Sequence, residues 1–327
     1  MFGLLKKNTY SIGIDICDDS LRLVQLGNNG NGIHLVAGIT EPRPEDIEFG
    51  SGNWQRWAIE TIRKQISSKN FQGKEVIAGI PTNAVFIDHM KMPKVNQEKI
   101  EDAMFSKIKQ KLPFEADLDN TMLKYVQSEQ ENVVIMATER TIIDRHLAIY
   151  EKAGTTIKTI TVWPSALINC YTAFFGRRKS DLNSIVMLIC IEKNCTNVVV
   201  CRHKNLLFAR SIPIGSAKLL DEAEIDRLVF ELTSCKRQLS AILKKTQIER
   251  LIFLSSRGAD KNICALIAKQ MEMPAQIGDP LAAVDVAGSF SSGKNNESNK
   301  NKAESGNPID RRNCQVNWAV AFGMSLS

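Results

Sequence analysis

Two short segments carry the residues whose types and spacing could do chemistry. In the first, Asp15 ends an apolar strand, and a polar turn and a second apolar strand follow over 16–26. The second segment, 184–200, repeats this order, and Thr196 begins its second strand. Backbone N–H groups in tight turns bind anions, and a carboxylate beside them can hold Mg²⁺ through water. The duplicated hairpin therefore predicts a place where phosphates are held between its two copies.

The second copy departs from the first where this chemistry would lie. An acidic residue is expected at the end of its first strand, but Cys190 stands there and Glu192 follows in the turn. A carboxylate in that turn would bring negative charge toward bound phosphate. In the first copy, Asp15 is either a metal-linked carboxylate or a carboxylate that accepts hydrogen bonds from the N–H groups of its own turn, together with Asp18, Asp19 and Ser20.

Composition and charge exclude several classes of function. The chain has 327 residues, of which 43% are hydrophobic and 24% charged, and this suits a soluble protein of two domains. Its formal charge of +6 is spread among acidic residues, so nucleic-acid binding is not predicted. The eight cysteines form no C-x-x-C pair and the four histidines have no ligand spacing, which predicts reduced thiols in a cytoplasmic protein and no metal site. No apolar run approaches the roughly 20 residues of a membrane-spanning helix.

The elements that must position these residues follow one plan in each half. Closely spaced strands require antiparallel pairing, so each half should begin with a three-stranded meander, followed by a helix and a strand. In the first half these are strands 10–16, 21–26 and 33–39, a helix around 54–66 and strand 75–80. In the second half they are strands 185–191, 196–202 and 206–213, helix 224–245 and strand 248–254, with a further helix over 262–271.

A small α/β insert is predicted between about 83 and 156 in the first half. It should contain strand 84–90, an amphipathic helix over 96–112, two strands within 118–137 and a helix that ends at Gly154. Strand 157–162 and helix 164–175 then return the chain to the first sheet. We expect a first domain over 1–178 and a second over 182–327, with a flexible polar loop at 290–307 and a C-terminal helix over 316–327 that packs on the body.

A meander, helix and strand that occur twice in one chain are the plan of the actin-like ATPase fold, which is ribonuclease H-like. Several phrases, in order, resemble the PilM family of type IV pilus assembly proteins, which is related to FtsA. These phrases lie at Ile12–Cys17, Met90–Lys94, Lys111–Asp117, Glu151–Gly154, Val162–Leu167, Arg210–Gly215 and Ala319–Met324. The resemblance implies an α/β fold of two actin-like domains, with a small inserted subdomain in the first half and a trimmed second half.

The resemblance also implies ATP and Mg²⁺ as ligands of the cleft. The nucleotide-binding candidates that it indicates are Asp15, Asp19, Ser20, Thr196, Lys236, Arg237, Ser240 and Gly258. The family's glycines and second acidic residue are replaced here by Cys17, Cys190, Glu192, Ser255 and Ser256. A Cβ at these turns crowds bound phosphate, so we expect weak or lost ATPase activity and name no catalytic residue. The basic group on the helix can equally be a solvated face.

The resemblance places the functional emphasis on the insert. In the PilM family the cytoplasmic tail of an inner-membrane partner, PilN, is held in a groove beside it, and we expect Met90, Met92, Ile100 and Met104 to contribute to its wall. The same four residues can equally be interior packing. The expected role is a cytoplasmic scaffold of type IV pilus or type II secretion assembly, held at the inner membrane through PilN-like and other platform proteins. The alternatives are an active actin-like ATPase or small-molecule kinase and a filament-forming relative of FtsA.

Overall fold

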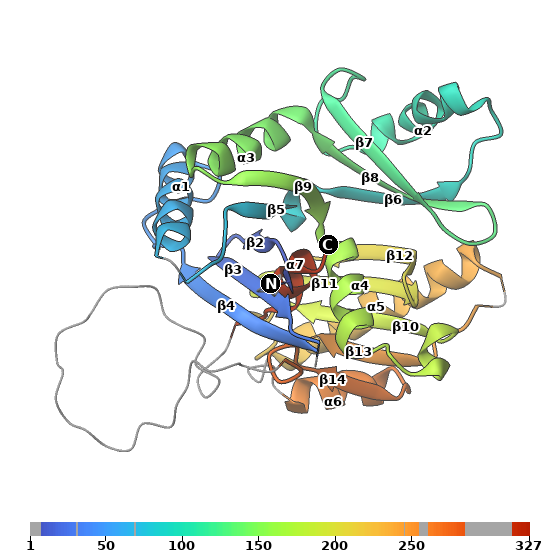
Figure 1. Ribbon diagram of the computed structural model, residues 1–327. Coiled ribbons are helices and arrows are strands. Elements are labelled where there is room, and N and C mark those ends of the chain that lie inside the picture. Colours follow the sequence, from blue (N-terminus) through green and yellow to red (C-terminus); the bar gives the residue numbers. More distant parts are fainter. Residues whose placement is uncertain (1–7, 31, 69, 245, 255–260, 285–315) are drawn as a thin grey trace, which may run out of the picture.

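The two larger sheets of the computed structural model have the same strand order (Figure 1). The structure describes residues 8–30, 32–68, 70–244, 246–254, 261–284 and 316–327. In each sheet an antiparallel meander is followed by two parallel strands. The first sheet runs β4 (Ile33–Pro42), β3 (Ser20–Asn28), β2 (Ile12–Ile16), β5 (Glu75–Ile80) and β9 (Thr156–Val162), with β1 (Asn8–Thr9) also paired to β3. The second runs β12 (Asn205–Ile212), β11 (Thr196–Arg202), β10 (Ile185–Ile191), β13 (Arg250–Leu254) and β14 (Ala275–Gly278).

This repeated order confirms the predicted fold class of a duplicated α/β body. The predicted loop at 290–307 and the nucleotide candidate Gly258 lie outside the described residues. No helix in the described ranges is long and apolar enough to cross a membrane.

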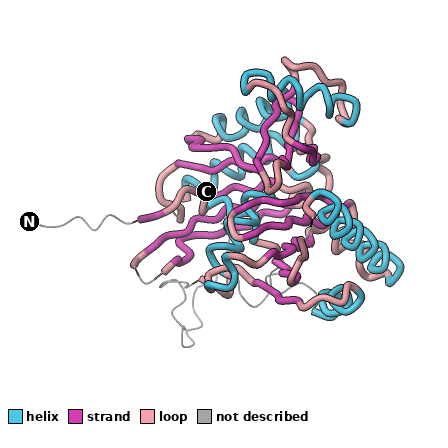
Figure 2. Tube along the Cα trace, turned by 90° about the vertical axis from the view of Figure 1, so that its right-hand side faces the viewer, coloured by secondary structure: helices cyan, strands magenta, loops and turns pink. Residues whose placement is uncertain are grey.

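The insert forms a separate small sheet of order β6-β8-β7. Its elements are β6 (Phe86–Lys91), α2 (Ile100–Ile108), β7 (Thr121–Gln127) and β8 (Asn132–Glu139), with short 3₁₀ turns at Thr82–Ala84, Gln97–Lys99 and Lys109–Lys111. In Figures 1 and 2 it lies at the top, above the two larger sheets. The next helix, α3 (Arg140–Lys152), packs Ile149 and Tyr150 into the core of the first sheet, beside α1 (Gly52–Ser67). The chain therefore rejoins the first half at α3.

One hydrophobic core joins the two halves. Helices α4 (Trp163–Phe174) and α7 (Ala319–Ser325) lie between the larger sheets, and their side chains share a cluster with Val24 of the first sheet and Leu188 of the second. The outer face of the second sheet is covered by α5 (Glu222–Ile242) and α6 (Lys261–Gln270). The halves thus have separate outer layers and a common centre.

Close backbone approach between α7 and α4 gives the first testable prediction. A Cβ added at Gly323 would lie 1.7 Å from the carbonyl oxygen of Ala166, which is helix backbone and cannot turn aside. We expect Gly323→Ala to lower the free energy of unfolding by roughly 2 kcal/mol or more, measured by urea denaturation. Gly52→Ala is the matched control, because nothing lies within 4 Å of its added Cβ and alanine favours the helix. Equal stability of the two variants would contradict the close packing.

Candidate functional site

Arg22 lies at the centre of the cleft between the two hairpins. It is placed opposite Asp15 by the antiparallel register of β3 and β2, so both side chains point to the same face of the sheet. Its Nη1 lies 2.9 Å from Oε2 of Glu192 in the second half and 3.5 Å from Oδ2 of Asp15. Its Nη2 lies 3.6 Å from Oδ1 of Asp19. With only 4% of its side chain exposed, this guanidinium joins carboxylates from both halves.

Asn317, near the C-terminus, joins Arg22 to the second half through hydrogen bonds. Arg22 Nη1 donates to the carbonyl oxygen of Asn317 at 2.9 Å. The Asn317 amide donates to the carbonyl oxygen of Leu254 at 3.0 Å and to Sγ of Cys190 at 3.1 Å. The Cys190 thiol in turn donates to Oε1 of Glu192 at 3.4 Å. Segments that are far apart in the sequence therefore form one buried polar network.

The two hairpin turns also bond to each other directly. The side-chain amide of Asn194, in the second turn, donates to Oδ2 of Asp18 in the first. Nearby, Asn197 Nδ2 donates to Oγ1 of Thr82 at 3.3 Å. The Asn194–Asp18 bond places side chains of the chain itself between the two hairpin turns, where the sequence predicts bound phosphate.

Burial controls the protonation of the network. It raises the pKa of Glu192 to about 7, although Arg22 acts in the opposite direction by favouring the carboxylate. Burial likewise raises the pKa of Asp15, again against the influence of Arg22. The pKa values of the Cys17 and Cys190 thiols are raised well above their usual range for the same reason. Both cysteines are therefore thiols rather than reactive thiolates at neutral pH.

The structure gathers only part of the predicted nucleotide site. Ser20 Oγ donates to Oδ1 of Asp19 at 2.9 Å, beside Asp15. Thr196 is fully buried, and its hydroxyl donates to the carbonyl oxygen of Ile214 at 2.7 Å, so this group is already satisfied.

The basic group predicted for the nucleotide lies elsewhere, on the exposed side of α5. Ser240 Oγ donates to the carbonyl oxygen of Lys236 in its own helix, and Arg237 lies over the exposed ring of Phe230 at 5.8 Å. No residue of α5 lines the cleft cavity described below. The arrangement of Lys236, Arg237 and Ser240 is that of a solvated helix face.

These residues do not fit Mg²⁺ with a nucleotide. Among the carboxylates that line the cleft cavity, Asp15 and Glu192 are engaged by Arg22 and Asp18 accepts a hydrogen bond from Asn194, so a metal ion would have to displace these partners. These carboxylates of the cleft are already paired and are not free to bind a metal ion.

Two cavities adjoin this network. The smaller, of about 390 Å³, is the remnant of the cleft and is lined by Asp15, Cys17, Asp18, Glu192 and Asn194 among others. The larger, of about 570 Å³, lies between the insert and the two halves. Asn83, Val85 and Ser211 line both cavities, so the two are neighbours.

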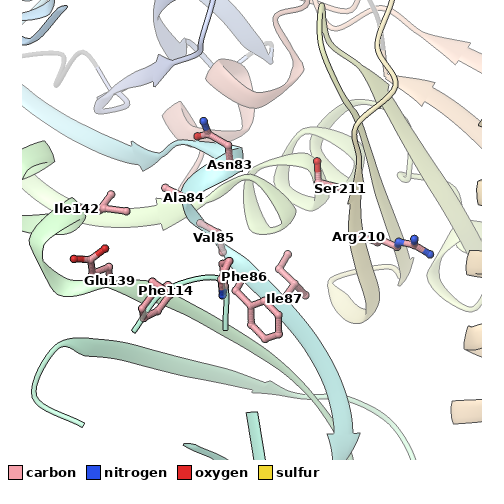
Figure 3. A pocket seen from close by; sticks show the side chains of 11 residues that line it. Asn83, Ala84, Val85, Phe86, Ile87, Phe114, Glu139, Ile142, Arg210 and Ser211 are labelled. Carbon is pink, nitrogen blue, oxygen red and sulfur yellow. The ribbon is translucent and has the colours of Figure 1, made fainter. Parts of the chain in front are cut away.

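The larger cavity has an apolar wall with charges beside it. Figure 3 shows Phe86, Ile87 and Phe114 close together, with Arg210 and Ser211 of β12 on one side. The side chains of Glu139 and Ile142, from the end of β8 and the start of α3, lie on the other side (Figure 3). First half, insert and second half all contribute to this lining.

The four residues predicted for partner binding have a different place. Met104 is fully buried, and Met90, Met92 and Ile100 pack partly buried against the same core of the insert. None of the four lines the larger cavity. These surroundings are compatible with interior packing, and a part for the four residues in partner binding stays a prediction.

Sequence reasoning missed Arg22, Asn194 and Asn317. Arg22 had a usable signal, because a charged residue within the apolar strand Leu21–Leu26 needs a buried partner, and a tight hairpin places it opposite Asp15. Asn194 and Asn317 had none, because their partners lie far away in the sequence.

Comparison with known proteins gives the family. A model described as type IV pilus assembly protein PilM matches residues 13–232. The solved PilM–PilN type IV pilus biogenesis complex matches with a TM-score of 0.70 and 16% identity, over 97% of this chain and 98% of that one. A Bacteroides thetaiotaomicron protein with an actin-like ATPase fold and unknown function matches with a TM-score of 0.51 and 12% identity, over 87% and 96%. The structures support the actin-like fold, and because the family model spans more than half of the sequence, the chain belongs to the type IV pilus assembly protein PilM family.

Proposed function

We propose that this chain binds the cytoplasmic tail of a PilN-like inner-membrane protein and thereby acts as a scaffold of type IV pilus or related type II secretion assembly. The observation that carries this proposal is the apolar cavity of about 570 Å³ between the insert and the two halves. Its size is in the range of ligand pockets. A solved relative of the same fold is a complex of PilM with PilN. The chain would then lie on the cytoplasmic face of the inner membrane, held there by its partners.

Strand edges beside the cavity favour an extended peptide as the ligand. Both β6 and β12 are edge strands of their sheets, and residues from each line the cavity. An extended segment can add its backbone to such an edge while its side chains enter apolar pockets. Phe86, Phe114 and Ile142 offer the apolar contacts and Glu139 offers a negative charge, whereas Arg210 is paired with Glu231 at 2.9 Å. This recognition needs no catalytic group.

The second candidate, an ATPase or kinase that uses the cleft, is disfavoured by the residues there. Arg22 engages both Asp15 and Glu192, and the hydroxyl of Thr196 is satisfied within the second half. We therefore propose that ATPase activity is weak or lost and that tail binding does not depend on Mg-ATP.

Ile142→Arg is expected to weaken tail binding at least tenfold, because it places a charge in the apolar wall that the tail would cover. The measurement is fluorescence polarisation with a labelled synthetic peptide of the cytoplasmic tail of the PilN protein from the same genome. The titration is repeated with saturating Mg-ATP, and the dissociation constant should not change.

Leu220→Arg is the matched control for this substitution. Leu220 is 92% exposed and lines neither cavity, so its variant should bind the peptide like the wild type. Equal affinity of the Ile142 variant and the wild type would place the tail elsewhere. Binding that requires Mg-ATP would favour the nucleotide-dependent alternative.

A further inference from the structure

The larger cavity depends on the relative position of the two halves. Arg210 and Ser211 come from β12 of the second sheet, whereas Phe86 and Ile142 come from the insert and the first half. A shift of the second half by a few ångströms would therefore widen or close the space between them. The contacts that fix the position of the second half therefore also determine whether the cavity can accept a peptide.

The shared hydrophobic core does not fix it alone. Apolar contacts around α4 and α7 are non-directional, and packed helices permit small sliding movements. Hydrogen bonds are directional, including those that a guanidinium donates to a carboxylate, because their strength falls steeply with distance and angle. In the cleft, such bonds between the halves run from Arg22 to Glu192, from Asn194 to Asp18 and from Asn197 to Thr82.

The insert end of the cavity is held separately. Gln130, in the turn between β7 and β8, exchanges two hydrogen bonds of 3.2 Å with the backbone of Lys244 after α5. Asn132 Nδ2 also donates to the carbonyl oxygen of Ile242 at 3.2 Å. β12 is itself tied to β6, because the backbone N–H of Ala209 donates to Nε2 of His89 at 3.2 Å. Loss of the cleft bonds would therefore loosen one end of the cavity and leave the other attached.

We propose, building on the function proposed above, that Arg22 and Glu192 are positioning residues for the tail site. Their ion pair joins the two hairpins by side chains of the chain itself and holds the second half where β12 completes the cavity. The cleft between the halves thereby acts as a permanent lock that needs no ligand. The two cavities share Asn83, Val85 and Ser211, so the lock lies directly beside the site that it shapes.

The test compares Glu192→Met with Glu192→Gln. Methionine removes the acceptor of the 2.9 Å bond but leaves Arg22 its contacts with Asp15 and Asp19, so the variant should fold. Glutamine keeps an oxygen that can accept from Arg22. If one tenth of the molecules keep the competent arrangement, the tail peptide binds Glu192→Met about tenfold more weakly. Glu192→Gln should bind nearly as tightly as the wild type.

Asp181→Asn is the control for a general loss of stability. It weakens another ion pair with a buried carboxylate, Arg250 to Asp181 at 2.7 Å, which lies away from the cleft. This variant should unfold more easily and still bind the peptide with wild-type affinity. Hydrogen–deuterium exchange of segments 13–24 and 189–200 provides a readout without the peptide, and faster exchange is expected for Glu192→Met alone.

Each result decides between the two proposals. Wild-type peptide affinity and unchanged exchange in folded Glu192→Met would overturn the lock, and so would equal weakening by Asp181→Asn. If the wild type binds no peptide, the proposed function fails, and the exchange measurement still decides whether Arg22 and Glu192 hold the halves together.

Discussion

Arg22→Met should lower the free energy of unfolding by about 3–5 kcal/mol. The guanidinium has 4% of its side chain exposed and contacts Glu192 at 2.9 Å and Asp15 at 3.5 Å. Its removal leaves these two carboxylates, each with 11% of its side chain exposed, without a cation in a setting that penalises charge. Urea denaturation followed by tryptophan fluorescence at pH 7.5 measures the change.

Two further variants separate this effect from the loss of any ion pair. Arg202→Met removes an ion pair with Glu129 in which the arginine side chain is 36% exposed and the glutamate side chain 24%. This variant should lower the free energy of unfolding by less than about 1 kcal/mol. The double variant Arg22→Met with Glu192→Met should be more stable than Arg22→Met alone, because it removes one stranded carboxylate together with the arginine. If Arg22→Met costs no more than Arg202→Met, the buried network does not stabilise the fold.

Much of the fold could be predicted because its signals are local. Apolar strands separated by polar turns determine a meander, since short turns permit only antiparallel pairing. Both β2 with β3 and β10 with β11 follow that rule. The helix of the insert was predictable from its spacing of Ile100, Met104 and Ile108, and this face packs on the core of the insert. The helix is shorter than the predicted 96–112, because 3₁₀ turns at Gln97–Lys99 and Lys109–Lys111 flank α2. Short β14 was missed, because its four residues show no alternation and its position depends on pairing with β13.

The site was less predictable, because its contacts join distant segments. The pairing of Arg22 with Asp15 follows from a hairpin register, but its bond to Glu192 requires the arrangement of the two halves. Sequence reasoning treated Glu192 as a charge that opposes phosphate, and the structure gives that charge a cation from the first half. Lys236 was grouped with the nucleotide by its helix, but only the placement of α5 shows that Arg237 and Ser240 are exposed and that the helix does not line the cleft cavity.

Periodicity in the sequence also could not identify which residues of the insert line the larger cavity. Met104 satisfies the apolar periodicity that predicts a helix face, but periodicity does not tell a core-facing residue from one that lines a groove. Ile142 has no special pattern and lines the cavity because α3 begins beside it. The residues best suited to a partner are therefore those at the junctions between the parts, and the polar bonds that fix these junctions become part of the binding function.

The cleft network should also have a recognisable dependence on pH. Glu192 has a pKa of about 7 in the folded protein against an ordinary value of 4.5. Between these values the folded protein holds a proton that the unfolded chain has released, so this group's contribution to stability is complete below about pH 4.5 and is lost as the pH rises through 7. The gap corresponds to roughly 3 kcal/mol.

We therefore expect Glu192→Gln to gain stability relative to the wild type as the pH rises from about 5 to about 8, by up to roughly 3 kcal/mol. Glutamine resembles the protonated acid and does not titrate. Burial lowers the pKa values of His89 and His146 to about 4, so these two groups make the fold more stable as the pH rises. Both proteins carry them, and their effect therefore cancels in the difference. Urea denaturation of both proteins at the two pH values gives this difference. A constant difference would mean that Glu192 is ionised throughout, and that the pair with Arg22 outweighs the cost of burying its charge.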